Sequence, residues 1–140
     1  MKKIPTVSRI VGAFTVQANN ILQIDKVIDY FLRDMEIVFY SHRVNYPRAL
    51  SAQVLPEKLK QAVVVKLESM KDKVKDYPII QKHPVLEKIT LRQIQDNINF
   101  LQAKDLHQYW DDCVDFNRKL DETRTQGPFE KINPEFANYV

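Results

Sequence analysis

The sequence predicts a helix-rich α/β protein, with one βαβ-like unit followed by a C-terminal helical section. Two runs rich in β-forming residues, 10–18 and 37–44, flank a segment with helical spacing, and further helical stripes follow Pro56. A chain of 140 residues is large enough for one domain with its own core. We therefore expect a single domain over residues 1–140 that is more than half helical.

The βαβ-like unit covers residues 10–47. The run 10–18 is the first expected strand, and Asn19 and Asn20 then offer N-cap side chains for a helix over 21–34. The run 37–44 is the second strand. If the two strands are parallel, the helix between them makes the crossover that parallel pairing requires.

The helical section covers residues 56–126. Pro56 suits the start of a helix, because the first turn needs no backbone donor there. The segment Thr90-Leu91-Arg92-Gln93 matches a capping box and predicts a helix start at Thr90. The last helix is expected to begin near Asp105 and to end at Gly127-Pro128. The apolar stripe of the first of these helices is formed by Leu59, Val63, Leu67, Met70 and Val74.

Two terminal segments complete the domain. Residues 1–9 are polar and are expected to be flexible. The tail, 127–140, is too apolar for a free segment, so we expect it to dock on the body. Its apolar residues are Phe129, Ile132, Phe136 and Tyr139.

Composition excludes several classes of site. The two glycines, Gly12 and Gly127, cannot build a phosphate-cradling glycine loop. One cysteine, Cys113, and three scattered histidines provide too few ligands for an iron–sulfur cluster or a closed metal site, so we expect no cofactor and no metal. Cys113 lies on an apolar stripe and is interpreted as a small buried hydrophobe, with no catalytic residue assigned.

The sequence also bears on location. It contains no apolar run long enough for a signal core or a membrane span, so we expect no membrane association and a cytoplasmic protein. The net charge of +3 is mild for a protein that binds nucleic acid.

Two blocks of the sequence carry a resemblance to a known family. The first is Asn45-Tyr46-Pro47 with the segment from Leu50 to Lys60, and the second comprises Phe116, Leu120-Asp121, Arg124, Phe129 and Pro134-Glu135-Phe136. Together they resemble the C-terminal part of phage-type radical S-adenosylmethionine proteins, from Thr15 onward. The three-cysteine motif that holds the cluster in that family is absent. The resemblance implies part of a barrel, a viral origin, and the cytoplasm of an infected or host cell.

Polar residues follow the two expected strands, where an α/β unit binds its ligands. They are Gln17, Asn19, His42, Arg43 and Asn45. In the family resembled, the matching strand ends face S-adenosylmethionine and substrate. The alternative is that these side chains only cap the elements, as Asn often does.

A second candidate site is a set of basic residues that could contact phosphates. It comprises Arg43, Arg48, Lys58, Lys60 and Lys66. Acidic residues interleave with the lysines, a pattern that is also typical of a solvated helix face. Near the chain end, the resemblance implies that Asp121 and Arg124 form a structural pair that locks the terminal segment onto the body.

Three functions remain open. The first is a non-catalytic interaction module that binds a protein partner or acts as a separately encoded subunit. The alternatives are a small nucleic-acid-binding protein that uses the Lys-rich helix, and a small-ligand binder at the strand ends. Two strands leave unpaired edges, and surface aromatics favour partner contacts, so we expect a protein partner or a homo-oligomer. The aromatics in question are Tyr109, Trp110, Phe129, Phe136 and Tyr139.

Overall fold

The computed structural model describes residues 10–125 and 127–139, and for Phe129 and Ile132 only the backbone. Two parallel strands, β1 (Val11–Val16) and β2 (Val38–Arg43), form a two-stranded sheet. Helices make up most of the remaining described residues, which confirms the predicted helix-rich α/β fold. The predicted flexible segment, 1–9, lies outside the described residues.

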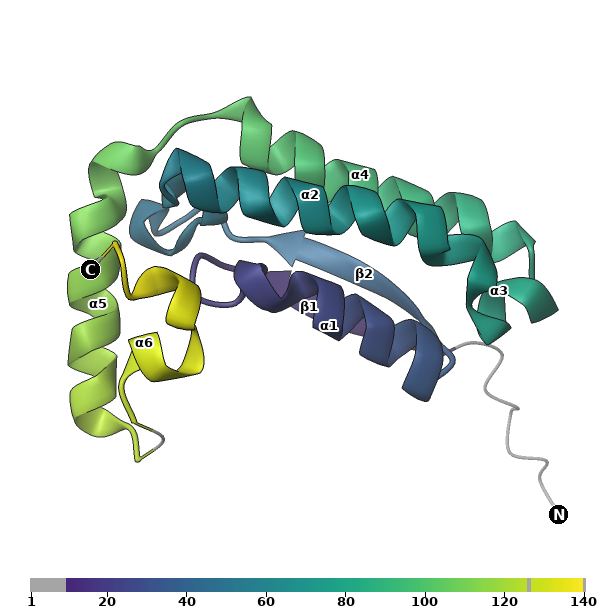
Figure 1. Ribbon diagram of the computed structural model, residues 1–140, viewed down its shortest axis with the longest axis horizontal. Coiled ribbons are helices and arrows are strands. Elements are labelled where there is room, and N and C mark those ends of the chain that lie inside the picture. The colour runs from purple at the N-terminus through teal and green to yellow at the C-terminus, as the bar shows by residue number, and fades with distance from the viewer. Residues whose placement is uncertain (1–9, 126, 140) are drawn as a thin grey trace, which may run out of the picture.

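Three long helices dominate the fold (Figure 1): α2 (Glu57–Lys73), α4 (Val85–Ala103) and α5 (Trp110–Thr123). The shorter helices are η1 (Ile21–Gln23), α1 (Ile24–Asp29) and the π-helical η2 (Tyr30–Asp34) between the strands, η3 (Arg48–Leu50) and η4 (Ala52–Val54) before α2, η5 (Val74–Asp76) and α3 (Pro78–Lys82) before α4, η6 (His107–Tyr109) before α5, and α6 (Phe129–Ile132) and η7 (Pro134–Phe136) in the tail.

Helices α1, α2 and α4 pack side by side as one layer over the strands (Figure 1). Alternate strand residues point into this layer, as the pleat requires. Gly12 lies against the ring of Phe31. Its register partner Phe39 is buried, and Ser41, two residues further along β2, bonds to α4 through Gln93.

The hydrophobic core fills the space between the helical layer and the sheet. The predicted stripe, from Leu59 in α2 to Val74 at the start of η5, is buried along its whole length. In the core, this stripe forms one cluster with Ile24 and Ile28 of α1 and with buried residues of α4. The α4 residues of this cluster are Ile94, Ile98 and Leu101.

Several helix ends differ from the prediction. Helix α4 begins at Val85, so the prediction of a start at Thr90 is wrong. Pro84 already has helical angles and opens the helix, as proline can in a first turn. Thr90 lies inside α4, where its Oγ1 donates to the carbonyl of Leu86 at 2.9 Å. The helix that was predicted to end at Gly127-Pro128, α5, ends at Thr123, four residues before Gly127, although Gly127 does have a positive φ of 89°.

The C-terminal part forms a limb at one end of the layer (Figure 1). The rings of Trp110 in α5 and Phe136 in η7 stack at 5.6 Å with an interplanar angle of 9°. Trp110 Nε1 also donates to the carbonyl of Tyr139 at 3.0 Å. These contacts hold the described part of the tail against α5.

Candidate functional site

One face of the sheet carries no helix among the described residues. The side chains that point away from the helical layer belong to alternate residues of both strands. Val11 and Tyr40 are 37% and 36% exposed, and Ile10, just before β1, is 66% exposed. Val38, at the start of β2, is the buried exception. We call the exposed set the open face; it comprises Ile10, Val11, Ala13, Thr15, Tyr40 and His42.

An uncovered parallel sheet is unusual. Parallel strands occur almost only where helices cover both faces, because their residues are apolar on both sides. In the described chain the helices cover one face, and Val11 and Tyr40 stay in contact with solvent on the other. The open face has no formally charged residue when His42 is neutral.

Side-chain amides occupy both edges of the sheet. The N–H of Val44 donates to the carbonyl of Val16, so the backbone of Val16 faces β2. The residues on either side of it, Thr15 and Gln17, therefore direct their backbone groups to the outer edge of the sheet. There the side chain of Asn20 accepts from the N–H of Gln17 and donates to the carbonyl of Thr15, both at 2.9 Å. Asn20 directly precedes η1, but its side chain makes no capping hydrogen bond to that helix and instead bonds to the backbone at the end of β1.

On the edge of β2, Gln93 of α4 has the same role. Its Oε1 accepts from the backbone N–H of Ser41 at 3.0 Å and from the Ser41 hydroxyl at 3.2 Å. Asn97, one turn further along α4, donates to Ser41 Oγ at 2.8 Å. Such capped edges disfavour the addition of a strand from another chain.

The structure does not bring the predicted strand-end residues into one pocket. His42 lies on the open face, whereas Arg43 points into the helical layer with its guanidinium 6.0 Å from the ring centre of Phe100. Gln17 is bonded to Asn20, and Asn45 is exposed. Within this set of strand-end residues, two buried atoms, Arg43 Nη1 and Asn19 Oδ1, have no hydrogen-bond partner among the described residues.

The segment that links β2 to α2 lies across this end of the sheet. The N–H of Ala18 donates to the carbonyl of Leu50 at 2.9 Å, and Gln53 Nε2 donates to the carbonyl of Phe100 at 2.6 Å. Residues 51–56 are all buried. The place where an α/β unit usually holds a ligand is therefore filled by the protein's own chain.

Three of the five candidate phosphate contacts, Arg48, Lys60 and Lys66, have hydrogen-bond partners within the protein. Lys66 Nζ donates to the carbonyl of Leu22 at 2.6 Å and to Glu135 Oε1 at 3.1 Å. Arg48 donates to the Tyr109 hydroxyl at 2.7 Å. Lys58 stays exposed.

Lys60 differs from the other lysines, because it is only 4% exposed. Its Nζ lies 2.9 Å from Asp105 Oδ1, in the loop after α4. This hydrogen bond, together with the backbone N–H of His107, lowers the pKa of Asp105. The sequence held no local signal for this pair, because its members lie 45 residues apart.

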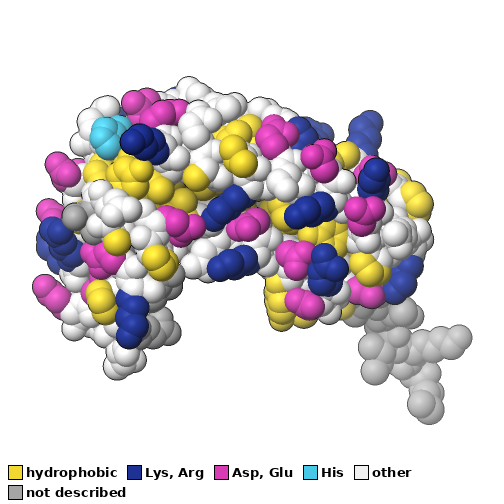
Figure 2. Space-filling view, viewed as in Figure 1, with side chains coloured by type: hydrophobic (Ala, Val, Ile, Leu, Met, Phe, Trp, Pro, Cys, Tyr) yellow, Lys and Arg dark blue, Asp and Glu magenta, His cyan; other side chains and the backbone are white. Residues whose placement is uncertain are grey.

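The surface charge is mixed. Lys2, Lys3 and Arg9 account for the whole net charge of +3, so residues 10–140 carry equal numbers of basic and acidic side chains. Figure 2 shows both signs interspersed over the helical face, without a continuous basic patch. Since nucleic acids attract proteins chiefly through clustered Lys and Arg, this arrangement disfavours the nucleic-acid alternative.

The remaining residues that the sequence analysis singled out are Asp121, Arg124 and Cys113. Asp121 is half-buried and Arg124 is exposed, and the Arg124 N–H donates to the Asp121 carbonyl at 3.3 Å. Cys113 is buried in α5, and burial raises the pKa of its thiol to about 11, which keeps it protonated.

No group of three or more metal-ligating side chains occurs within the described chain. None of the helices described here is long and apolar enough to cross a membrane.

The terminal aromatics are largely covered by the chain itself. Trp110 and Phe136 are buried, and Tyr109 and Tyr139 are half-buried against the core. The Phe129 side chain lies outside the described residues. On the described part of the sheet, the exposed apolar side chains are thus those of the open face. Sequence periodicity could have grouped its residues, but only the tertiary structure shows which face the helices leave free.

Comparison with known proteins gives no match for this chain, whether with family models, with curated protein sequences or with solved structures.

Proposed function

We propose that the protein is a non-catalytic interaction module that binds a helix of another protein across its open face. The observation that carries the proposal is a parallel sheet on which the helices of the described residues cover one face only. A helix on the second face would complete the usual three-layer arrangement.

The width of the open face fits a single helix of another protein. Six residues of strand span about 20 Å, and two strands are about 10 Å wide, which gives roughly 200 Å². A helix with its side chains is about 10–12 Å across and therefore matches the width of the sheet.

The chemistry of the open face defines the stripe that such a helix must present. Opposite Val11, Ala13 and Tyr40, the partner helix must carry apolar side chains at helical spacing. Opposite Thr15 and His42, at the far end of the face, it can carry one polar side chain. Because the face has no formal charge, binding should depend little on salt.

The capped edges of the sheet favour a helix as the partner over a separately encoded half-barrel. A half-barrel would have to add strands beside β1 or β2, where Asn20 and Gln93 already occupy backbone groups. A helix that lies on the face leaves both caps in place.

The test is site-specific photo-crosslinking in the native cells. A photoreactive residue at Ala13 on the open face should capture one discrete protein, and the same residue at Val65, which is 67% exposed on α2, should not. The captured protein, once identified and purified, should bind the wild type and lose its affinity for Tyr40→Lys. Equal capture from both positions, or equal affinity for wild type and Tyr40→Lys, would refute the proposal.

A further inference from the structure

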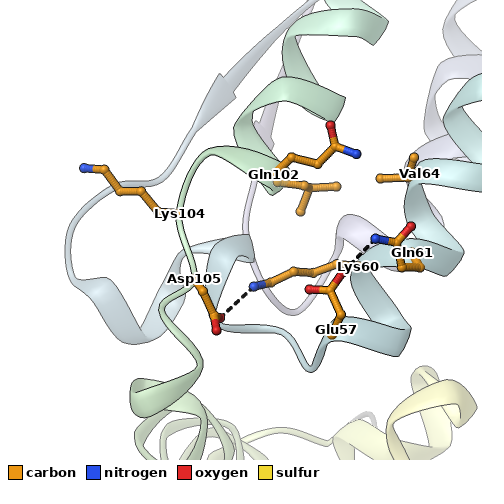
Figure 3. A pocket seen from close by; sticks show the side chains of 8 residues that line it. Glu57, Lys60, Gln61, Val64, Gln102, Lys104 and Asp105 are labelled. Atoms are coloured by element: carbon orange, nitrogen blue, oxygen red, sulfur yellow. Dashed lines mark hydrogen bonds and ion pairs between the residues drawn. The ribbon is translucent and has the colours of Figure 1, made fainter.

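A small cavity lies at the end of the helical layer where α2 begins and α4 ends (Figure 3). Its volume is about 170 Å³. Glu57, Lys60, Gln61 and Val64 of α2 line one side, and the other side is formed by α4 and the loop that follows it. The residues of this second side are Leu101, Gln102, Lys104 and Asp105.

The buried ammonium of Lys60 is the most distinctive group of this cavity. An ammonium has three donors, and one of them is directed to Asp105 Oδ1 at 2.9 Å. Among the described residues, this is the single hydrogen bond of Lys60 Nζ, so two donors remain for the cavity. A buried charge with unused donors is a strong attractor for an acceptor that carries negative charge.

The cavity also carries negative charge and an apolar wall. Glu57 accepts from Gln61 Nε2 through Oε1 at 2.7 Å, which leaves its second oxygen available. Figure 3 shows the Glu57 carboxylate beside the Lys60 chain, whereas Lys104 points away. Val64 and the buried Leu101 provide the apolar part.

We propose that this cavity binds a small α-amino acid, with the ligand carboxylate on Lys60, its ammonium on Glu57, and a short aliphatic side chain against Val64 and Leu101. A cavity of about 150 Å³ holds benzene, so about six heavy atoms fit, the number in alanine. The lining offers both signs of charge, which suits a zwitterion better than a simple anion or a simple amine. The inference is independent of the open face.

The test is an NMR titration of the isotopically labelled full chain with L-alanine, with propionate and with ethylamine, at constant ionic strength. Alanine should give saturable shifts of the side-chain amides of Gln61 and Gln102. Propionate and ethylamine each lack one of the two charged groups, so each should bind at least about tenfold more weakly than alanine.

Two variants assign the binding to its residues. Lys60→Met and Glu57→Gln should each abolish the saturable shifts. Lys58→Met, on the same turn but exposed, should leave them unchanged. Glu57 is exposed, so Glu57→Gln keeps the test decisive if Lys60→Met fails to fold.

Three results would overturn the proposal: no saturable shift with alanine, shifts of equal strength with all three compounds, or binding that persists in Glu57→Gln and Lys60→Met.

Discussion

Replacement of Gly12 by alanine tests which face of the sheet the helices cover. A Cβ on Gly12 would lie 2.5 Å from Cε1 and 2.7 Å from Cδ1 of Phe31. Carbon atoms in contact normally sit about 3.5–4.0 Å apart, so the Phe31 ring would have to withdraw by about 1 Å. The ring packs against the core between η2 and β1, which limits its freedom to move.

The magnitude follows from two opposing terms. Overpacking of a filled site costs about 1–3 kcal/mol. Alanine in place of glycine in a strand regains about 0.5–1 kcal/mol. We therefore expect Gly12→Ala to lower the free energy of unfolding by about 1–2 kcal/mol, measured by urea denaturation with an unchanged slope.

The neighbouring residue supplies the control. Ala13 points to the open face, so Ala13→Val should change the free energy of unfolding by no more than about 0.5 kcal/mol. In a Phe31→Leu background the cost of Gly12→Ala should shrink, because the two positions are in contact. If Gly12→Ala is stabilising, or if Ala13→Val costs as much, the assignment of the two faces is refuted.

Three further predictions concern the tail and the titratable groups. Phe136→Ala should lower the free energy of unfolding by about 3–5 kcal/mol in urea, since Phe136 is fully buried against Trp110; a loss below about 1 kcal/mol would contradict tail docking. Burial, and a hydrogen bond to Asp29, raise the pKa of Tyr77, so its contribution to stability is present below about pH 10 and is lost as pH rises further. Tyr77→Phe should therefore flatten the alkaline part of the stability curve, and an unchanged curve would exclude this role. Cys113 should react with a thiol reagent near pH 8 only at the rate of unfolding, so rapid labelling in native buffer would show that the thiol is accessible.

Much of the fold was predictable because its signals are local. The apolar stripe from Leu59 to Val74 depends on helical spacing alone, and the structure buries that stripe as predicted. The start of α4 was misplaced because Thr90 matches a capping pattern, whereas Pro84 further upstream already opens the helix. A local motif does not report whether an earlier residue has started the same helix.

The candidate site was less predictable, because tertiary contacts decide it. Alternation along a strand already implies that His42 and Arg43 point to opposite faces, but not which face is covered. The burial of Lys60 depends on Asp105, which comes from a distant loop. Of the basic residues that the sequence offered as phosphate contacts, Arg48, Lys60 and Lys66 are bonded to residues far away in the chain.

The most direct test of the open face as a binding surface is thiol labelling of Ala13→Cys, both in purified protein and inside native cells. The introduced thiol would be the accessible one, since the single natural cysteine, Cys113, is buried. We predict rapid labelling of the purified protein and strong protection in cells, with Val65→Cys labelled rapidly in both. Equal labelling of Ala13→Cys in the two settings would contradict the claim that a partner covers this face.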